Sequence, residues 1–283
     1  MLVLRIIDLA GASLFVRSHG DPTGRVLLVL HGGPGWDHSY LLPALDDLVG
    51  LRYVVLFDLR GCGRSSRDLD VAAYQPDRCV DDAAALITRL GADRADVLGS
   101  GHGGQLAMLL AQRYPHLVDR LVLASTTAYP AIQDDLSRHP EHRRRAPAVE
   151  AAVAASLADP TVEQTRATAM AAAPLHLWDL DLLAPWRAVL DRIRFSDAWN
   201  PGRRAGTLHP PLPADPERAL RNLRRPTLIL HGAQDLVFPV RAAHRLHAAV
   251  PLSELAVLDD AGHAAHFEAR AGWVDRVRAF LGP

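Results

Sequence analysis

Short runs of consecutive apolar residues recur along the chain, each followed by a glycine-containing loop and then by a segment with helical spacing. Apolar runs of this length are typical of strands that are covered on both faces. Their alternation with helical segments predicts βα units and a mostly parallel sheet. The predicted strands of this kind lie at residues 25–30, 53–57, 95–98, 121–124, 226–230 and 254–258.

The start of the chain has a different pattern. Residues 3–9 and 13–17 alternate between apolar and polar positions, which predicts a hairpin that turns at Gly11-Ala12. Helices are predicted where apolar residues recur at helical spacing. These segments are residues 39–49, 78–90, 103–114, 240–250 and 267–281.

Between residues 129 and 216 the strand-like runs stop, and Ala, Arg and Pro dominate. Helices are plausible at 147–157, 162–173 and 186–193. We therefore predict a core domain from residues 1–128 and 217–283, with a helical cap inserted at 129–216. The run Arg143-Arg144-Arg145 in this cap is interpreted as a solvated face rather than a phosphate clamp.

Composition narrows the function classes. Of 283 residues, 49% are hydrophobic and 22% charged, and the formal net charge of −1 gives no electrostatic case for nucleic acid or an anionic membrane as partner. The 31 basic residues are all Arg, which excludes a lysine nucleophile. Cys62 and Cys79 have neither metal-site nor disulfide-framework spacing. We expect a cytoplasmic protein, monomeric or homodimeric, that acts on a small molecule.

Candidate chemistry gathers in the loops that follow the predicted strands. Ligands bind beyond the carboxyl ends of strands in such sheets. The segment Gly99-Ser100-Gly101-His102-Gly103 reads as a strand end, a sharp turn and a helix start, the geometry of the nucleophile elbow G-x-S-x-G. Gly101 occupies the position where that pattern has its serine. Other such loops are HGGPG at 31–35, DLRGCGRS at 58–65, Asp235 after PTLILHG, and AGH at 261–263.

These five motifs, in this order, resemble the α/β-hydrolase superfamily, and within it the proline-iminopeptidase-like group. The resemblance covers residues 1–128 and 226–283 but not the predicted cap. It implies an α/β-hydrolase fold with a mostly parallel central sheet. It also implies that His263 is the catalytic base, that Asp235 accepts its other N–H, and that the backbone N–H groups of Gly33 and His102 form an oxyanion hole.

Several other residues are candidates for a chemical role. Ser100 as nucleophile would put His102 where close packing needs glycine, and Cys62 lies in a loop that is structural in the family. His102 either faces the site or only starts the helix. His31 is expected to orient its own loop. His266 follows His263 by three residues, but no third ligand presents itself, so no metal is predicted. No organic cofactor is indicated either.

Substrate contacts are expected from the loops and the cap. In proline iminopeptidases, acidic cap residues hold the substrate's amino group, and Asp179 and Asp181 loosely resemble that arrangement, although a surface helix with ordinary charges explains them as well. The large apolar residues of the predicted cap either line the side of a lid that faces an apolar ligand or form the core of the lid itself. The residues assigned to substrate binding are Gly32, Trp36, Trp178 and Trp186.

Three functions follow from these residues. In the first, the chain is an enzyme that works without an acyl-serine intermediate, with His263–Asp235 as general base and a backbone oxyanion hole, in a cyclisation, elimination, isomerisation or water-mediated hydrolysis. In the second, it is a serine hydrolase or aminopeptidase of the proline-iminopeptidase-like group, in a variant whose nucleophilic serine was deliberately changed to Gly101 to trap a ligand. In the third, it is a non-catalytic ligand-binding receptor on the same scaffold.

Overall fold

A computed structural model of the chain describes residues 1–129 and 136–282. Within them, eight strands form one sheet in the order β1-β2-β4-β3-β5-β6-β7-β8. The strands are β1 (Leu2–Leu9), β2 (Ala12–His19), β3 (Val26–Leu30), β4 (Tyr53–Phe57), β5 (Ala95–Ser100), β6 (Val118–Ala124), β7 (Thr227–Gly232) and β8 (Ser253–Leu258).

The sheet has two antiparallel strands at one edge and parallel strands elsewhere. β1 and β2 form the predicted hairpin, with Leu9 opposite Ala12, and β2 runs antiparallel to β4. All remaining neighbours are parallel. Every residue of β3, β4 and β5 is buried. The mostly parallel α/β sheet predicted from the apolar runs is therefore confirmed.

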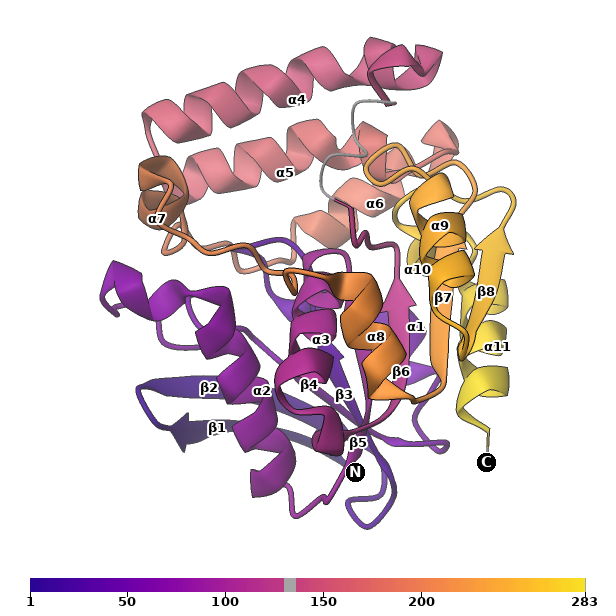
Figure 1. Cartoon of the computed structure of the whole chain (residues 1–283). Coiled ribbons are helices and arrows are strands. Elements are labelled where there is room, and N and C mark those ends of the chain that lie inside the picture. The colour runs from indigo at the N-terminus through magenta and orange to yellow at the C-terminus, as the bar shows by residue number, and fades with distance from the viewer. Residues whose placement is uncertain (130–135, 283) are drawn as a thin grey trace.

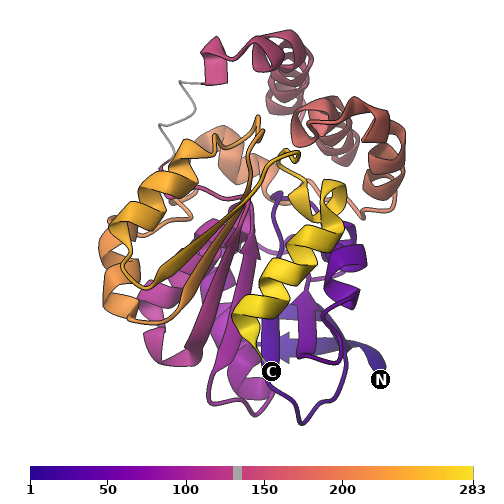
Figure 2. The same ribbon diagram turned by 90° about the vertical axis from the view of Figure 1, so that its right-hand side faces the viewer.

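Helices cover both faces of the sheet (Figures 1 and 2). The apolar core on one face includes side chains of α2, α3, α8 and α9, and the core on the other face includes side chains of α1, α10 and α11. These helices are α1 (Leu42–Asp46), α2 (Pro76–Arg89), α3 (His102–Arg113), α8 (Pro216–Leu223), α9 (Arg241–Ala249), α10 (Ala265–Glu268) and α11 (Arg270–Leu281), with 3₁₀ turns η1 (His38–Leu41), η2 (Val71–Tyr74) and η3 (Pro115–Leu117).

Two predicted helices are divided in the structure. The segment 39–49 is the 3₁₀ turn η1 followed by the short helix α1. Pro43, at the start of α1, has no N–H to continue the hydrogen-bond ladder of a preceding turn. The segment 267–281 is split between α10 and α11 at Ala269, whose φ of −113° is not helical. We have no physical account of that second break.

Of the helices described between β6 and β7, those from residue 140 to residue 205 lie above the carboxyl ends of the strands (Figures 1 and 2). Three of them correspond to predicted helices with shifted ends, and α7, like α8, was not predicted. The helices are α4 (Pro140–Ala158), α5 (Val162–His176), α6 (Leu183–Leu190) and α7 (Asn200–Ala205), with the 3₁₀ turn η5 (Leu180–Leu182) before α6. The division into core and cap domains stays a prediction, and part of its boundary, residues 130–135, lies outside the described residues.

Helix α4 begins seven residues before the predicted start at Pro147. Pro140 supplies an equally favourable first position, and Glu141 pairs with Arg144 and Arg145 across the first turns. The buried Arg145 guanidinium also donates to the carbonyls of Pro174 and Leu177 at the end of α5. One arginine of the 143–145 run therefore joins two helices instead of facing solvent.

The described residues contain no helix that combines the length and the apolar character needed to cross a bilayer.

Candidate active site

The turn between β5 and α3 has a backbone conformation that only glycine adopts easily. Gly101 has φ +56° and ψ −120°. The glycines around it are required by close packing: a Cβ at Gly99 would lie 2.4 Å from the Gly103 carbonyl oxygen, and one at Gly103 would lie 2.1 Å from that of Leu30. The loop thus holds the start of α3 directly against the ends of the central strands.

Space is available at Gly101 itself. A Cβ built there would lie 3.7 Å from His263 Nε2, 3.9 Å from Gly32 Cα and 3.9 Å from the Ser125 carbonyl oxygen, all ordinary contact distances. A Cβ at this position would therefore displace no neighbour, and only the positive φ would strain a residue other than glycine. The Cβ would face His263.

His263 and Asp235 form a hydrogen-bonded pair. His263 follows β8, Asp235 follows β7, and His263 Nδ1 lies 2.9 Å from Asp235 Oδ2. Because a carboxylate only accepts, Nδ1 carries the proton and Nε2 keeps its lone pair on the side of Gly101. Asp235 is fully buried, whereas the His263 side chain is 20% exposed. The pair has the geometry of a histidine base with an orienting carboxylate.

Asp235 is held by further donors. Its Oδ1 accepts from the backbone N–H groups of Val237 and Phe238 at 2.7 and 2.8 Å, and His231 Nε2 lies 3.2 Å from Oδ2. Burial alone would raise the pKa of Asp235, but the charge of His263 and the hydrogen bonds of both histidines outweigh it and hold the pKa below its ordinary value. Asp235 therefore remains an anion beside His263.

His231 was not selected from the sequence. It is fully buried at the end of β7, and its Nε2 also lies 2.8 Å from the Phe238 carbonyl oxygen. Burial lowers its pKa, yet the hydrogen bond to Asp235 outweighs this and raises the pKa above its ordinary value. The available signal was the spacing in His231-Gly232-Ala233-Gln234-Asp235, which puts both side chains in one short loop.

The two predicted backbone donors lie in neighbouring loops. A Cβ on Gly32 would lie 3.4 Å from the His102 backbone nitrogen, so the HGGPG loop and the start of α3 nearly touch. Neither the Gly33 nor the His102 N–H donates to a backbone carbonyl within residues 1–129 and 136–282. Both groups are available to a bound ligand.

A cavity of about 240 Å³ lies where these loops meet, and it brings most of the predicted residues together. Trp178 is outside it: its ring packs against Arg145 and His139 instead. Asp179 and Asp181 do not line the cavity either. The lining includes Gly32, Gly33, Trp36, Tyr40, Ser100, Gly101, His102, His176, Trp186, Val237, Phe238, His263 and His266.

Three more histidines line this cavity, and burial keeps them neutral. Burial lowers the pKa of His176 and of His266 to about 3, and that of His102 to about 4. His176 Nδ1 accepts from Trp186 Nε1 at 3.2 Å, which places the His176 proton on Nε2. Within the described residues, no group of three or more His, Cys, Asp or Glu side chains could hold a metal ion.

The other nucleophile candidates have structural partners. Ser100 is 7% exposed and interacts with the phenol of Tyr40, which also accepts from the Gly32 N–H at 2.8 Å. Cys62 is fully buried, and burial raises its pKa to about 12, so it is a thiol outside the cavity. His31 is buried too: its Nδ1 bonds to the Gly32 carbonyl and its Nε2 accepts from the Leu59 N–H, so it orients its loop as expected.

Comparison with known proteins places this geometry in a family. A family model described as the alpha/beta hydrolase fold matches residues 25–270. The chain is 30% identical over 270 residues to a proline iminopeptidase of Lactiplantibacillus plantarum, covering 90% of this chain and 91% of the relative. It is 26% identical over 287 residues to a 2-hydroxymuconate semialdehyde hydrolase of Pseudomonas sp. (strain CF600), covering 97% and 93%.

A solved structure gives the same fold. The enol-lactonase of Burkholderia xenovorans LB400 superposes with a TM-score of 0.75 at 19% identity, covering 98% of this chain and 99% of that one. With the sheet order, the loops at the strand ends and the matched residues in agreement, this chain belongs to the α/β-hydrolase fold family.

Proposed function

We propose that this α/β-hydrolase-fold protein is an enzyme that acts on a small, largely apolar organic substrate without forming an acyl-serine intermediate. One observation carries the proposal. The turn that faces His263 has glycine at its centre, at φ +56°, with ordinary space for a Cβ. The remaining groups of a base-catalysed site surround it.

His263 would act as the general base. Its Nε2 takes a proton from a water molecule or from an acidic C–H or O–H of the substrate, and Asp235 stabilises the imidazolium that forms. The N–H groups of Gly33 and His102 would stabilise negative charge on the substrate oxygen, as enolate or alkoxide. Cyclisation, elimination, isomerisation and water-mediated hydrolysis all fit this set of groups.

The cavity supports a small and mostly apolar substrate. Its volume is about 240 Å³, and the rings of Trp36, Trp186 and Phe238 form much of its wall. The polar groups that line it include His263, the neutral histidines, the hydroxyls of Tyr40 and Ser100 and the loop N–H groups. Apolar walls with a few convergent polar groups are typical of small-molecule sites.

A second candidate is a serine hydrolase or aminopeptidase in which glycine has replaced the nucleophile. The open position at Gly101 and the relatives that are named as a peptidase and a hydrolase favour it. A ligand-binding receptor is a third candidate. The hydrogen bonds that hold Asp235 against His263 weigh against that candidate, because ligand binding alone does not need a histidine oriented by a carboxylate.

The test compares four proteins: the natural chain, His263→Ala, Gly101→Ser, and the exposed-histidine control His244→Ala. A panel of aryl esters, aryl lactones and 1,3-diketones is screened for turnover, and a fluorophosphonate probe is applied with mass-spectrometric mapping. We expect turnover of at least one class by the natural chain, reduced by about 100-fold or more in His263→Ala and unchanged in His244→Ala.

The probe separates the candidates. Only Gly101→Ser should be labelled, at residue 101, because only it has a hydroxyl facing His263. Labelling of the natural chain at Ser100 would contradict the proposal. Full turnover by His263→Ala would contradict it as well. If the panel is converted by Gly101→Ser alone, the serine-hydrolase candidate replaces the first.

A further inference from the structure

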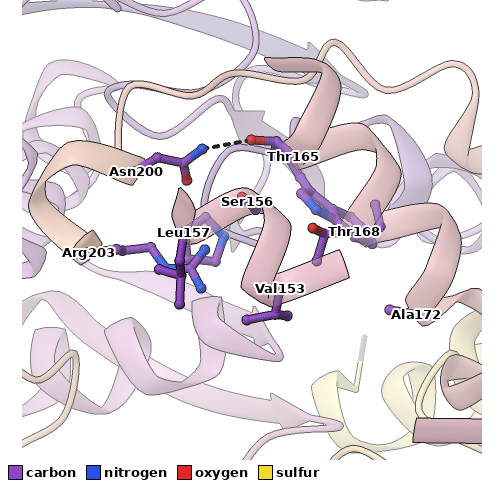
Figure 3. Close-up of a pocket in the computed structure, with 11 residues that line it drawn as sticks. Val153, Ser156, Leu157, Thr165, Thr168, Ala172, Asn200 and Arg203 are labelled. Carbon is purple, nitrogen blue, oxygen red and sulfur yellow. Dashed lines mark hydrogen bonds between the residues drawn. The ribbon is translucent and has the colours of Figure 1, made fainter. Parts of the chain in front are cut away.

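A second cavity lies among the helices above the sheet (Figure 3). Its volume is about 100 Å³, and its walls come from α4, α5, α7 and the HGGPG loop. Pro34 and Trp36 line both this cavity and the cavity that contains His263. The two cavities are therefore neighbours that share part of one wall.

This helical cavity has one charged side chain among the described residues that line it. Arg203, on α7, is an exposed residue at the rim, and Ser156 and Leu157 of α4 line the same cavity. The rest of the lining is apolar or neutral. Its polar members include Asn200, which is 6% exposed and stands three residues before Arg203, on the same face of α7.

Arg203 has no acidic partner within residues 1–129 and 136–282. By contrast, Arg52 pairs with Asp96 and Arg60 with Asp82 at 2.8 and 2.6 Å. The positive charge of Arg203 also acts toward the reaction cavity. It adds to burial in lowering the pKa of His102. The exposed guanidinium is thus a cation without an acidic partner among the described residues, and it lines the helical cavity only.

Further donors stand beside this cation. Asn200 Nδ2 donates to Thr165 Oγ1 at 2.9 Å, and Thr165 in turn donates to the Thr161 carbonyl, which fixes the orientation of the amide. One N–H of Asn200 remains for a ligand. Ser156 is half-buried, and its hydroxyl also has no partner in the described part of the chain.

We propose that this helical cavity binds a carboxylate group of the substrate while the reacting carbon lies beside His263. The inference rests on the proposed function and adds a substrate class to it: a small apolar molecule with a carboxylate at one end. A guanidinium fork matches the two oxygens of a carboxylate, and one cation neutralises one such charge.

The size of the cavity agrees with this class. On the measure that gives this cavity about 100 Å³, a site for one water molecule needs about 10–15 Å³, so the cavity admits a carboxylate on a short carbon chain. A phosphate monoester carries nearly two charges and three oxygens. Arg203, Ser156 and Asn200 do not supply enough charge for it. A free amine, as on a peptide N-terminus, would be repelled by Arg203.

Binding is tested by isothermal titration calorimetry with 4-phenylbutyrate and its uncharged analogue 4-phenylbutyramide. The natural chain should bind the carboxylate at least about fivefold more tightly than the amide, since a charge-assisted hydrogen bond at a partly exposed site contributes on that order. Arg203→Gln should remove this preference. Arg204→Gln is the matched control, because Arg204 is exposed on the same helix but does not line the cavity.

A steric variant locates the site. Ala172→Leu fills the cavity without changing charge, and it should weaken binding of both probes. Equal affinity of the natural chain for carboxylate and amide overturns the inference. So does a loss in Arg204→Gln as large as in Arg203→Gln, or displacement of the carboxylate by inorganic phosphate at equal concentration.

These outcomes are independent of the proposed function. His263→Ala should keep the preference for the carboxylate over the amide, because Arg203 and Asn200 are unchanged, whatever happens to its turnover. If Arg203→Gln loses the preference while His263→Ala keeps full turnover, the carboxylate site stands and the proposed chemistry fails. The reverse pattern retains the chemistry and overturns the carboxylate site.

Discussion

The backbone at Gly101 gives the most direct prediction. Replacing Gly101 by Ala should destabilise the protein, because a non-glycine residue at φ +56° and ψ −120° carries strain of about 1–3 kcal/mol. No overpacking adds to this, since the nearest atoms to the new Cβ lie 3.7–3.9 Å away. Loss of glycine freedom in the unfolded chain offsets about 0.4–1 kcal/mol. The net loss should be roughly 0–2.6 kcal/mol.

The matched control is Gly272→Ala in helix α11. Gly272 does not have a positive φ, and its new Cβ would lie 3.6 Å from Leu258 Cδ2, an ordinary contact. That substitution should stabilise the protein by up to about 1 kcal/mol. The two glycine-to-alanine changes are therefore expected to have opposite signs, although both add one methyl group at an uncrowded position.

Urea denaturation at pH 7 measures both free energies of unfolding, and thermal melts check them, at roughly 2–4 °C per kcal/mol. The reasoning is refuted if Gly101→Ala is as stable as Gly272→Ala. It is supported if only Gly101→Ala loses stability. Glycine at this turn would then relieve strain that any nucleophile-bearing residue has to carry.

Three further predictions concern the pKa shifts and the helix contacts. Asp235→Asn should lower turnover by on the order of 10⁴. Because the pKa of Asp235 is depressed, its stability advantage over Asn should be present above pH 3.8 and disappear as the pH falls through the lower folded value, measured by urea titrations at several pH values. His176 has a pKa of about 3 in the folded protein, so its protonation favours the unfolded state as the pH falls below 6.5. His176→Gln should therefore reduce the slope of the free energy of unfolding against pH by about 1.4 kcal/mol per pH unit between pH 4 and 6. An unchanged slope would contradict the burial of a neutral His176. Arg145→Ala should lower the free energy of unfolding, measured in urea, by about 1–3 kcal/mol, because the Arg145 side chain is 6% exposed and donates to carbonyls at the end of α5. Arg144→Ala should lower it by less than about 0.5 kcal/mol, because the Arg144 side chain is 61% exposed. Equal losses would refute the structural role of Arg145.

Local physics let the sequence specify much of the fold. The apolar runs at β3, β4 and β5 predict buried strands because only a strand covered on both faces has no polar side to expose. The glycines at 99, 101 and 103 likewise identify the turn between β5 and α3. At Gly99 and Gly103 the backbone of this turn lies so close to other backbone atoms that no larger residue fits. Such constraints act within a few residues, so they are readable along the chain.

Element ends were less readable where several residues could start or end a helix. Both Pro140 and Pro147 can open α4, and only the pairing of Glu141 with two arginines decides in favour of the earlier start. The short helix α7 has no apolar periodicity of its own over Asn200–Ala205. Its position depends on contacts with other helices, so its sequence alone could not predict it.

In the candidate active site, too, some features could be predicted from the sequence and others depended on the tertiary structure. The sequence placed Asp235, His263 and Gly101 at strand ends, and their meeting follows from parallel strands sharing one edge. Tertiary structure decided three other features: that His231 lies beside Asp235, that Trp178 lies outside the cavity, and that Arg203 lies at the rim of a second cavity. Those features depend on how helices above the sheet pack against loops far away in the chain, and no local pattern encodes contacts between segments so distant in sequence.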